Sequence, residues 1–174
     1  MKRPALRLVE DTGAAPIEWV WFCGHCAAPS PNAAPPAPNH RVCTACGLGL
    51  MLESRKDLVP STRDSFVVVD STLLEQAVSR RAETLLGVSE EMAINRPITE
   101  LLVPADAEAQ AGSRFAASVA EALATEEPVQ AFVRPWNTFG VRMRARIAAC
   151  GPPRAALIVL DDSPARTLRA VESS

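Results

Sequence analysis

The sequence predicts an α+β fold, with a five-stranded antiparallel sheet that carries its helices on one face and a small metal-binding module in front of it. Two observations support this prediction. Two Cys-x-x-Cys pairs lie within residues 23–46, and from residue 65 onward the order is strand, strand, short helices, long helix and three strands. A chain of 174 residues, 48% hydrophobic and 22% charged, is long enough for one ordinary globular domain and a smaller one.

Turn signals and changes of composition divide the chain into five parts. In order, we expect an N-terminal tail (1–16), the metal module (17–56), a polar linker with a proline (57–64), the α+β domain (65–162) and a short C-terminal helix (163–174). The module is too small to fold by hydrophobic burial alone, so we expect a bound metal to supply most of its stability.

The strongest signal in the chain is the set of four cysteines in the module. Cys23 and Cys26 form one Cys-x-x-Cys turn, Cys43 and Cys46 form the other, and 16 residues separate the two turns. Each turn presents two sulfurs to one metal, and a tetrahedral zinc ion takes four such ligands. The sequence therefore predicts one structural Zn²⁺ per chain, bound by these four cysteines.

Other uses of the four cysteines stay open at this stage. Two disulfides would need an oxidising compartment, and residues 1–16 lack the apolar core of a signal peptide. A thioredoxin-like redox pair would lie beside a βαβ pattern, which the sequence lacks, whereas an iron–sulfur cluster could use the same four sulfurs. His25 and His40 lie nearby and could replace a sulfur, but with four cysteines present we expect both histidines outside the ligand set.

Strand-forming residues flank the two cysteine turns. Residues 17–22 alternate so that Trp19 and Trp21 share a face with Cys23, and residues 48–53 provide a second strand. Either both tryptophans belong to the core of the module, or one of them is exposed and can anchor another surface.

The α+β domain begins with two strands and a short helix. The strands are expected over residues 65–70, where an Asp-Ser turn follows, and over residues 74–78. Ser79 is placed to cap a helix over residues 80–86, which Gly87 ends in the left-handed conformation that glycine tolerates.

Two short elements, a long helix and three strands complete the domain. Ser89 is placed to cap a helix that ends near Asn95, and Pro97 opens a short turn through Leu102. Residues 107–125 are rich in alanine and carry apolar residues at helical spacing. The last three strands, separated by turns that contain glycine, are expected over residues 129–136, 141–149 and 155–160.

This order, and the residues within its segments, resemble the PAS sensory domain. The likeness rests on Phe66-Val67-Val68-Val69-Asp70 and on residues 82–91, 96–104 and 157–162. PAS domains commonly have glycine before the Arg-Pro step, where this chain has Asn95; asparagine tolerates a left-handed backbone, so we expect the turn to be kept. The segment Cys43-Thr44-Ala45-Cys46-Gly47 resembles the knuckle of zinc-ribbon proteins, so residues 17–56 are identified as a zinc ribbon.

The resemblance limits the cofactors. PAS domains bind small ligands between sheet and helices, or bind nothing and act by dimerising. Haem-binding members use a histidine on or near the long helix; here His25 and His40 both lie in the zinc ribbon, so no histidine-ligated haem is expected. Light-sensing flavin members carry a reactive cysteine in an Asn-Cys-Arg motif; Cys150, outside the ribbon, has no such motif, so no flavin adduct is expected.

The charge pattern limits the partners. Residues 1–56 carry six Lys and Arg against four Asp and Glu, and the whole chain has a formal net charge of −2, so neither part resembles a basic nucleic-acid binder. No run of 18 apolar residues is present, so we expect no transmembrane helix. Arginines at 142, 144 and 146 share one face of a strand, as either a partner-binding stripe or a solvated surface.

We expect a cytoplasmic sensory or regulatory protein that is not an enzyme, because no nucleophile, base and orienting acid group together in the sequence. Its PAS domain would mediate dimerisation or small-ligand sensing, and its zinc ribbon would dock an unidentified protein partner. We expect a homodimer, no contact with membranes and no tight binding of nucleic acid. Two alternatives stay open: a transcription regulator that binds DNA through the zinc ribbon, and a redox switch in which oxidation of the zinc thiolates releases the metal.

Overall fold

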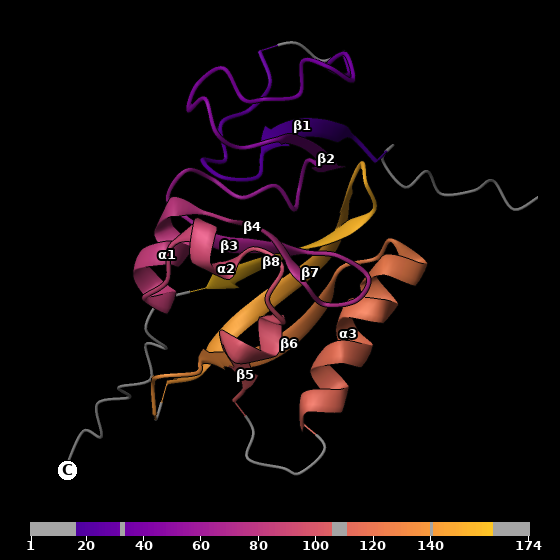
Figure 1. The fold of residues 1–174 in the computed structure, drawn as a ribbon. Coiled ribbons are helices and arrows are strands. Elements are labelled where there is room, and N and C mark those ends of the chain that lie inside the picture. The colour runs from indigo at the N-terminus through magenta and orange to yellow at the C-terminus, as the bar shows by residue number, and fades with distance from the viewer. Residues whose placement is uncertain (1–16, 32–33, 106–110, 140, 162–174) are drawn as a thin grey trace, which may run out of the picture.

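The computed structural model describes residues 17–31, 34–105, 111–139 and 141–161, and the predicted N-terminal tail and C-terminal helix lie outside these ranges. Its strands form one antiparallel sheet in the order β1-β2-β7-β8-β3-β4, with β6 paired to β7 and β5 paired to β6 (Figure 1). The five predicted strands are all present, as β3 (Ser65–Val69), β4 (Glu75–Val78), β6 (Val129–Pro135), β7 (Met143–Gly151) and β8 (Ala155–Asp161). The predicted α+β class and antiparallel sheet are confirmed.

Three further strands extend this sheet: the two strands predicted in the cysteine module and one strand that was not predicted. They are β1 (Trp19–Cys23), β2 (Met51–Arg55) and β5 (Leu102–Pro104). The strand β2 starts at Met51 rather than at Leu48, because residues 47–50 form the turn that follows the second cysteine pair. The chain therefore passes directly from the second cysteine turn into a strand of the sheet.

The helices follow the predicted order and end where the local signals place them. They are α1 (Arg80–Leu86), α2 (Glu90–Ala93), a 3₁₀ turn (Ile98–Glu100) and α3 (Ala111–Thr125). The Ser79 hydroxyl accepts a hydrogen bond from the Ala82 N–H, and Gly87 ends α1 with φ of +67°. Asn95 has φ of +64°, so it takes the left-handed conformation expected of it. Ser89 lies at the N-cap position directly before α2, as predicted, but its side chain makes no capping hydrogen bond.

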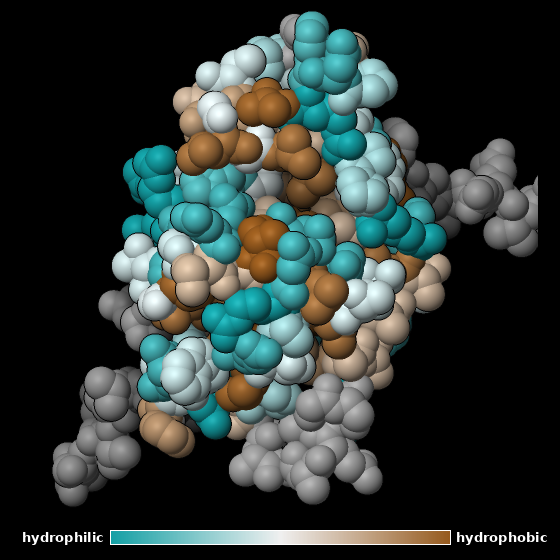
Figure 2. Space-filling model, in the orientation of Figure 1, coloured by the Kyte–Doolittle hydropathy of each residue, from teal (hydrophilic) through white to brown (hydrophobic). Residues whose placement is uncertain are grey.

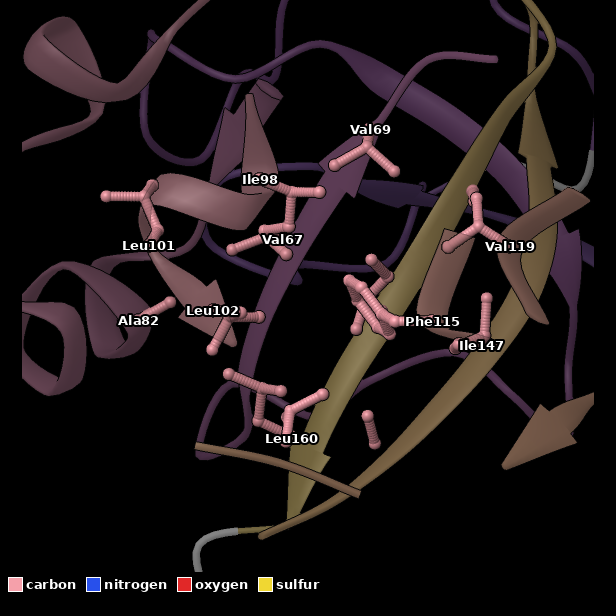
Figure 3. Close-up of a cluster of buried hydrophobic side chains, with 14 of the residues drawn as sticks. Val67, Val69, Ala82, Ile98, Leu101, Leu102, Phe115, Val119, Ile147 and Leu160 are labelled. Atoms are coloured by element: carbon pink, nitrogen blue, oxygen red, sulfur yellow. The ribbon is translucent and has the colours of Figure 1, made fainter. Parts of the chain in front are cut away.

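The main hydrophobic core lies between the inner face of the sheet and the helices. Figure 3 shows Val67 and Ile147 of the sheet together with Leu102, Phe115 and Val119, and all five side chains are buried. The strands β3, β6, β7 and β8 each contribute every second side chain to this core, because successive side chains of a strand point to opposite faces of the sheet. None of the described helices has the length and apolar stretch needed to cross a lipid bilayer.

The outer face of the sheet is covered by the module that carries the cysteines, defined here as residues 17–56. Phe22 packs edge-to-face against Phe66 of β3, with 6.2 Å between ring centroids, and both rings are buried. Ser54 pairs with Cys150 in the β2–β7 ladder, and its hydroxyl donates a hydrogen bond to the Ala149 carbonyl at 2.9 Å. The expected linker packs Val59 against the same cluster. The module is therefore joined to the sheet by hydrogen bonds and by a second, smaller core.

One buried acid interrupts the main core. Glu75 is paired with Val69 in the β3–β4 ladder next to a register shift, and its side chain has no exposed surface. Neither carboxyl oxygen of Glu75 finds a hydrogen-bond partner among the described residues. Burial raises the pKa of this carboxyl to about 8, so Glu75 is mostly uncharged at neutral pH. Nothing in the sequence marked Glu75 as a core residue.

The Glu75→Gln variant should remove a pH dependence from the stability of the fold. The pKa of Glu75 is about 8 in the folded chain, against an ordinary value of 4.5. Between these two values the unfolded chain releases a proton that the folded chain keeps, so the free energy of unfolding falls as pH rises, with a limiting slope of about 1.4 kcal/mol per pH unit. Glutamine cannot ionise, and its variant should lack this slope.

Urea unfolding of the full chain at pH 5, 6, 7 and 8 measures this contribution. The control is Glu121→Gln, which replaces an exposed glutamate on α3. The difference in slope should appear for Glu75→Gln and not for the control. Equal slopes for Glu75→Gln and the unchanged protein would show that Glu75 is not held uncharged.

Candidate metal centre

The structure brings the four predicted cysteines together into one cluster. Their sulfur atoms all lie within 4.8 Å of one another, and no other group of at least three cysteine, histidine or acidic side chains in the described part of the chain is arranged to hold a metal. The sulfurs of Cys23 and Cys46 are 3.7 Å apart, and those of Cys26 and Cys43 are 3.9 Å apart. Four sulfurs placed about 2.3 Å from a central zinc ion at tetrahedral angles are about 3.8 Å from each other. The cluster could therefore hold a zinc ion.

Two glycines shape the second cysteine turn. Gly47 has φ of +70°, which lets the chain reverse after Cys46, as the sequence predicted. Gly49 was not predicted to matter, yet a side chain there would collide with the Cys23 sulfur and come within 2.9 Å of the His25 nitrogen. The two cysteine turns approach so closely that only glycine fits at position 49.

Backbone N–H groups point at two of the sulfurs. The Cys23 sulfur accepts from the N–H groups of His25 and Cys26 at 3.4 Å each, and the Cys46 sulfur accepts from Gly49 at 3.5 Å. Such donors stabilise a thiolate, the form in which cysteine binds a metal. The backbone of the turns therefore stabilises the negatively charged thiolates of Cys23 and Cys46 even without a metal.

Burial acts against these donors. It is the main cause that raises the pKa of both Cys23 and Cys26. At Cys46 burial also raises the pKa, but the N–H groups of Gly49 and Leu48 and the neighbouring sulfurs outweigh it and bring the pKa to about 6. A bound cation removes the cost of burying thiolates, because coordination to a metal deprotonates a thiol outright. A buried set of soft sulfur ligands suits zinc or iron rather than magnesium or calcium.

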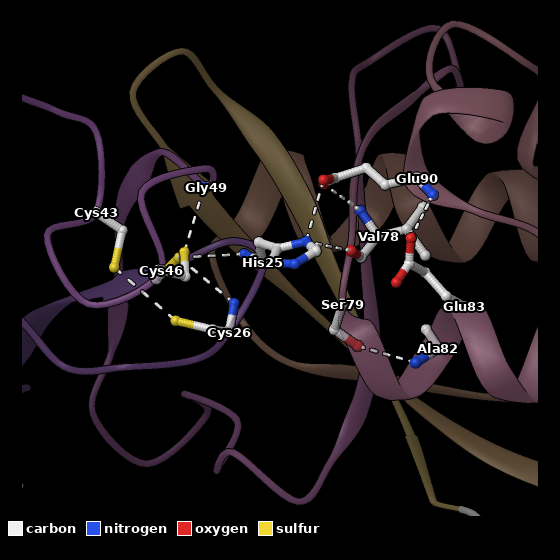
Figure 4. A network of polar contacts seen from close by, with 11 residues as sticks. His25, Cys26, Cys43, Cys46, Gly49, Val78, Ser79, Ala82, Glu83 and Glu90 are labelled. Atoms are coloured by element: carbon white, nitrogen blue, oxygen red, sulfur yellow. Dashed lines mark hydrogen bonds and ion pairs between the residues drawn. The ribbon is translucent and has the colours of Figure 1, made fainter.

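His25 lies between the first two cysteines in sequence but turns away from their sulfurs. Figure 4 shows its ring directed toward the α+β domain, where Nδ1 lies 3.2 Å from the Val78 carbonyl and 3.0 Å from a carboxylate oxygen of Glu90. Both neighbours are acceptors, so Nδ1 carries the proton and donates it. His25 is 4% exposed and His40 is exposed. As expected, neither histidine lies in the sulfur cluster.

The contact of His25 belongs to a wider network. The other Glu90 oxygen accepts from the Val78 N–H at 3.1 Å, and the Glu90 N–H donates to a Glu83 carboxylate oxygen at 2.7 Å. The His25 carbonyl accepts from the Arg80 N–H at 3.3 Å. The first cysteine turn is thereby connected to β4, α1 and α2. Nothing in the local sequence indicates this role of Glu90, because its partner is 65 residues away in the chain.

The remaining candidate residues do not belong to the sulfur cluster. Cys150 is buried in the outer-face core, and burial raises the pKa of its thiol to about 12, which makes it unreactive. Trp21 is buried beside the cysteines, whereas Trp19 is 40% exposed, so only Trp19 is left as an anchor for another surface. Arg144 pairs with Asp161 at 2.9 Å, and Arg142 stacks over the Phe132 ring at 4.0 Å.

Comparison with protein families identifies the α+β domain. The family model described as "PAS fold" matches residues 53–155, which is more than half of the chain. The match begins in β2 and ends in β8, so it covers the last strand of the cysteine module as well. A search of curated protein sequences finds no significant match.

Solved structures of PAS domains are similar to this chain at low sequence identity. The PAS domain of the histidine kinase ThkA is 15% identical, with a TM-score of 0.40 over 57% of this chain and 99% of that one. The PAS domain of a protein from Colwellia psychrerythraea is 23% identical, with a TM-score of 0.38 over 56% of this chain and 85% of that one. The E. coli DhaR(N)–DhaL complex matches 56% of this chain at 18% identity and a TM-score of 0.38, over 31% of its own chain.

The purified protein should contain one zinc ion per chain, and Cys43→Ser should lose it. Structural zinc supplies about 10–16 kcal/mol of apparent binding energy in modules of this size, so three sulfurs should not keep the cysteine turns folded. Elemental analysis gives the metal content, and hydrogen exchange shows which residues open. Cys150→Ala, which changes a cysteine outside the cluster, should keep its zinc. Iron in place of zinc, or a full complement of zinc in Cys43→Ser, would contradict this assignment.

The His25→Ala variant should destabilise the protein without changing its zinc content. It leaves the Val78 carbonyl and Glu90 without their buried donor, which costs on the order of 1–3 kcal/mol. The matched variant His40→Ala removes an exposed histidine and should change the free energy of unfolding by less than about 0.5 kcal/mol. Chemical unfolding and elemental analysis measure the two quantities; loss of zinc from His25→Ala would instead make His25 part of the ligand set.

Proposed function

Since the chain belongs to the PAS fold family, we propose that it is a non-catalytic sensory or regulatory protein. Its PAS domain (65–162) responds to a signal by binding a small ligand or by dimerising. Its cysteine module holds one structural Zn²⁺ and docks a protein partner. One observation carries the proposal: the cysteine module is joined to the PAS sheet by the β2–β7 pairing and by the packing of Phe22 in the outer-face core.

The contacts between the cysteine module and the PAS domain support the proposal that a change in one affects the other. The strand β2 continues the sheet through β7, Phe22 fills the outer-face core, and His25 contacts Glu90 at the start of α2. A displacement of α2 or of the outer face of the sheet would therefore also move the cysteine turns. A zinc module on a flexible tether would have no such contact with the domain that receives the signal.

The basic residues of the module favour a protein partner over DNA. Arg41 donates to the carbonyls of Met51 and Pro152. Arg55 pairs with Asp57 and Glu127, and Lys56 pairs with Glu18 at 3.0 Å. Contacts to phosphates need lysine or arginine side chains that face outward and can displace the counterions of the nucleic acid. In the described part of the module, these three basic residues already have partners within the chain.

The buried position of Glu75 supports a role without catalysis. A general acid or base must lie within hydrogen-bond reach of its substrate, whereas Glu75 has no exposed surface. The thiol of Cys150 is buried as well. Among the described groups outside the cysteine cluster, the two whose pKa is raised by burial, Glu75 and Cys150, thus both lie out of reach of solvent.

The partner-docking function is tested with the tagged full chain in cells of its source organism. Chemical crosslinking and mass spectrometry should recover one protein in about equal amount from the wild type and from Cys150→Ala, and not from Cys43→Ser. A parallel titration with random duplex DNA should give a Kd no tighter than about 10⁻⁴ M at physiological salt, the weak end of non-specific binding. Nanomolar DNA binding with a steep salt dependence would overturn the proposal in favour of a transcription regulator.

We propose in addition that the protein is a homodimer through the end of the sheet that the module leaves open. Four large apolar side chains around the β6–β7 turn are 41% or more exposed: Phe132, Trp136, Phe139 and Val141. Exposed apolar residues that gather in one region favour an interface, and two-fold dimers are the commonest closed arrangement.

Light scattering on the full chain tests the dimer. The wild type should give twice the chain mass of 18.6 kDa, and Trp136→Glu should give a single chain mass. Met92→Glu, which changes an equally exposed apolar residue on α2, should remain dimeric because it lies elsewhere. A wild-type mass near 18.6 kDa at micromolar concentration would refute the dimer.

A further inference from the structure

A groove lies where the cysteine module meets the outer side of the PAS sheet. Its volume is about 670 Å³, within the range of known ligand and peptide sites. From the module, Gly24, residues 48–50 and Leu52 form one wall, and residues of β3, β4, α2 and the β7–β8 turn form most of the rest. In Figure 2, apolar side chains gather on the module and on the part of the domain next to it.

The walls of the groove are apolar and partly open to solvent. Seven of the lining residues are aliphatic and come from both the module and the domain: Leu48, Leu50, Leu52, Val68, Ala77, Ile94 and Ala155. Leu48 is 67% exposed and Leu50 is 51% exposed, although leucine is usually buried. Two exposed leucines beside a hollow leave apolar surface that a partner could cover.

The rim of the groove is acidic. Asp70, Glu90 and Glu91 line it, and hydrogen bonds from Thr72 and Leu74 outweigh burial and keep the pKa of Asp70 below its ordinary value. Glu91 is exposed. The one basic lining residue, Arg154, directs its guanidinium to the Leu123 carbonyl and toward Glu126.

We propose that this groove docks an amphipathic helix of a partner protein, with leucine-like side chains on one face and lysine or arginine beside them. The apolar walls take the hydrophobic face of the helix, and the three carboxylates take its basic residues; this is the arrangement in which helices bind grooves. The inference rests on the proposed partner-docking function and names the chemistry of that partner. Since Glu90 both lines the groove and contacts His25, the bound helix would lie next to the His25–Glu90 contact between module and domain.

The test uses the full zinc-loaded chain and a synthetic helical peptide of 14 residues. The peptide has leucine at positions i, i+3, i+4 and i+7 and lysine on both flanks of this stripe; a second peptide replaces every lysine by glutamate. Fluorescence anisotropy gives each affinity, and amide chemical shifts show where the peptide binds. The basic peptide should bind at least about tenfold more tightly than the acidic one, a difference of about 1.4 kcal/mol. Its largest shifts should lie in residues 48–52 and 90–94.

Two pairs of variants separate the groove from general attraction to an acidic protein. Glu91→Lys on the rim should lower the affinity for the basic peptide by about fivefold or more. Glu121→Lys on α3 should change that affinity by less than about twofold. Leu48→Ser should weaken binding, and Met92→Ser, at a similar exposure outside the groove, should not. Equal effects within either pair would overturn the proposal.

The same experiment separates this inference from the proposed function. Shifts of the groove residues on dilution of the protein alone, with no response to the peptide, would show that a second copy occupies the groove and would refute the inference. If the crosslinked partner is found but neither peptide binds, partner docking stands and the helix chemistry is wrong. Peptide binding at the groove in a protein that has no zinc-dependent partner would support the groove and overturn the function.

Discussion

The strand β1 packs into two cores at once, and the rest of the structure depends on this packing. Its alternate side chains point in opposite directions, so that Trp21 and Cys23 face the sulfur cluster while Phe22 packs on Phe66. A slip of one residue would exchange the two sets and move Cys23 away from the metal site. The metal centre and the outer face of the sheet therefore favour the same register of β1, and each stabilises the strand that the other needs.

Signals that act within a few residues predicted much of the fold. The Ser79 cap, the left-handed Gly87 and the left-handed Asn95 are each determined by one side chain and its neighbours, and all three are found as expected. The Cys-x-x-Cys turns belong to the same class, because each turn brings its own two sulfurs together. The alternation of residues 17–22 also predicted correctly which side chains share a face.

Contacts between distant segments could not be predicted in this way. The sequence shows that residues 17–23 form an alternating strand, but not that Phe22 will meet Phe66 or that β2 will pair with β7. Gly49 matters only because a second cysteine turn lies against it. Glu75 has the residue type of a surface position and becomes a core residue through the register shift in the β3–β4 ladder. In each case the deciding neighbour is far away in the chain.

The metal site inside the module and the His25–Glu90 contact that joins the module to the domain differ in strength, and this difference decides which of them breaks first. A structural zinc site supplies about 10–16 kcal/mol of apparent binding energy, whereas a buried hydrogen bond such as that of His25 is worth on the order of 1–3 kcal/mol. A zinc ion bound by the four sulfurs would hold the first cysteine turn, and with it His25, in place against Glu90. A signal worth a few kcal/mol that moves α2 can break the His25–Glu90 contact but cannot release the metal. In the function proposed above, the His25–Glu90 contact, rather than the metal centre, would therefore be the point at which a signal in the PAS domain is passed to the module.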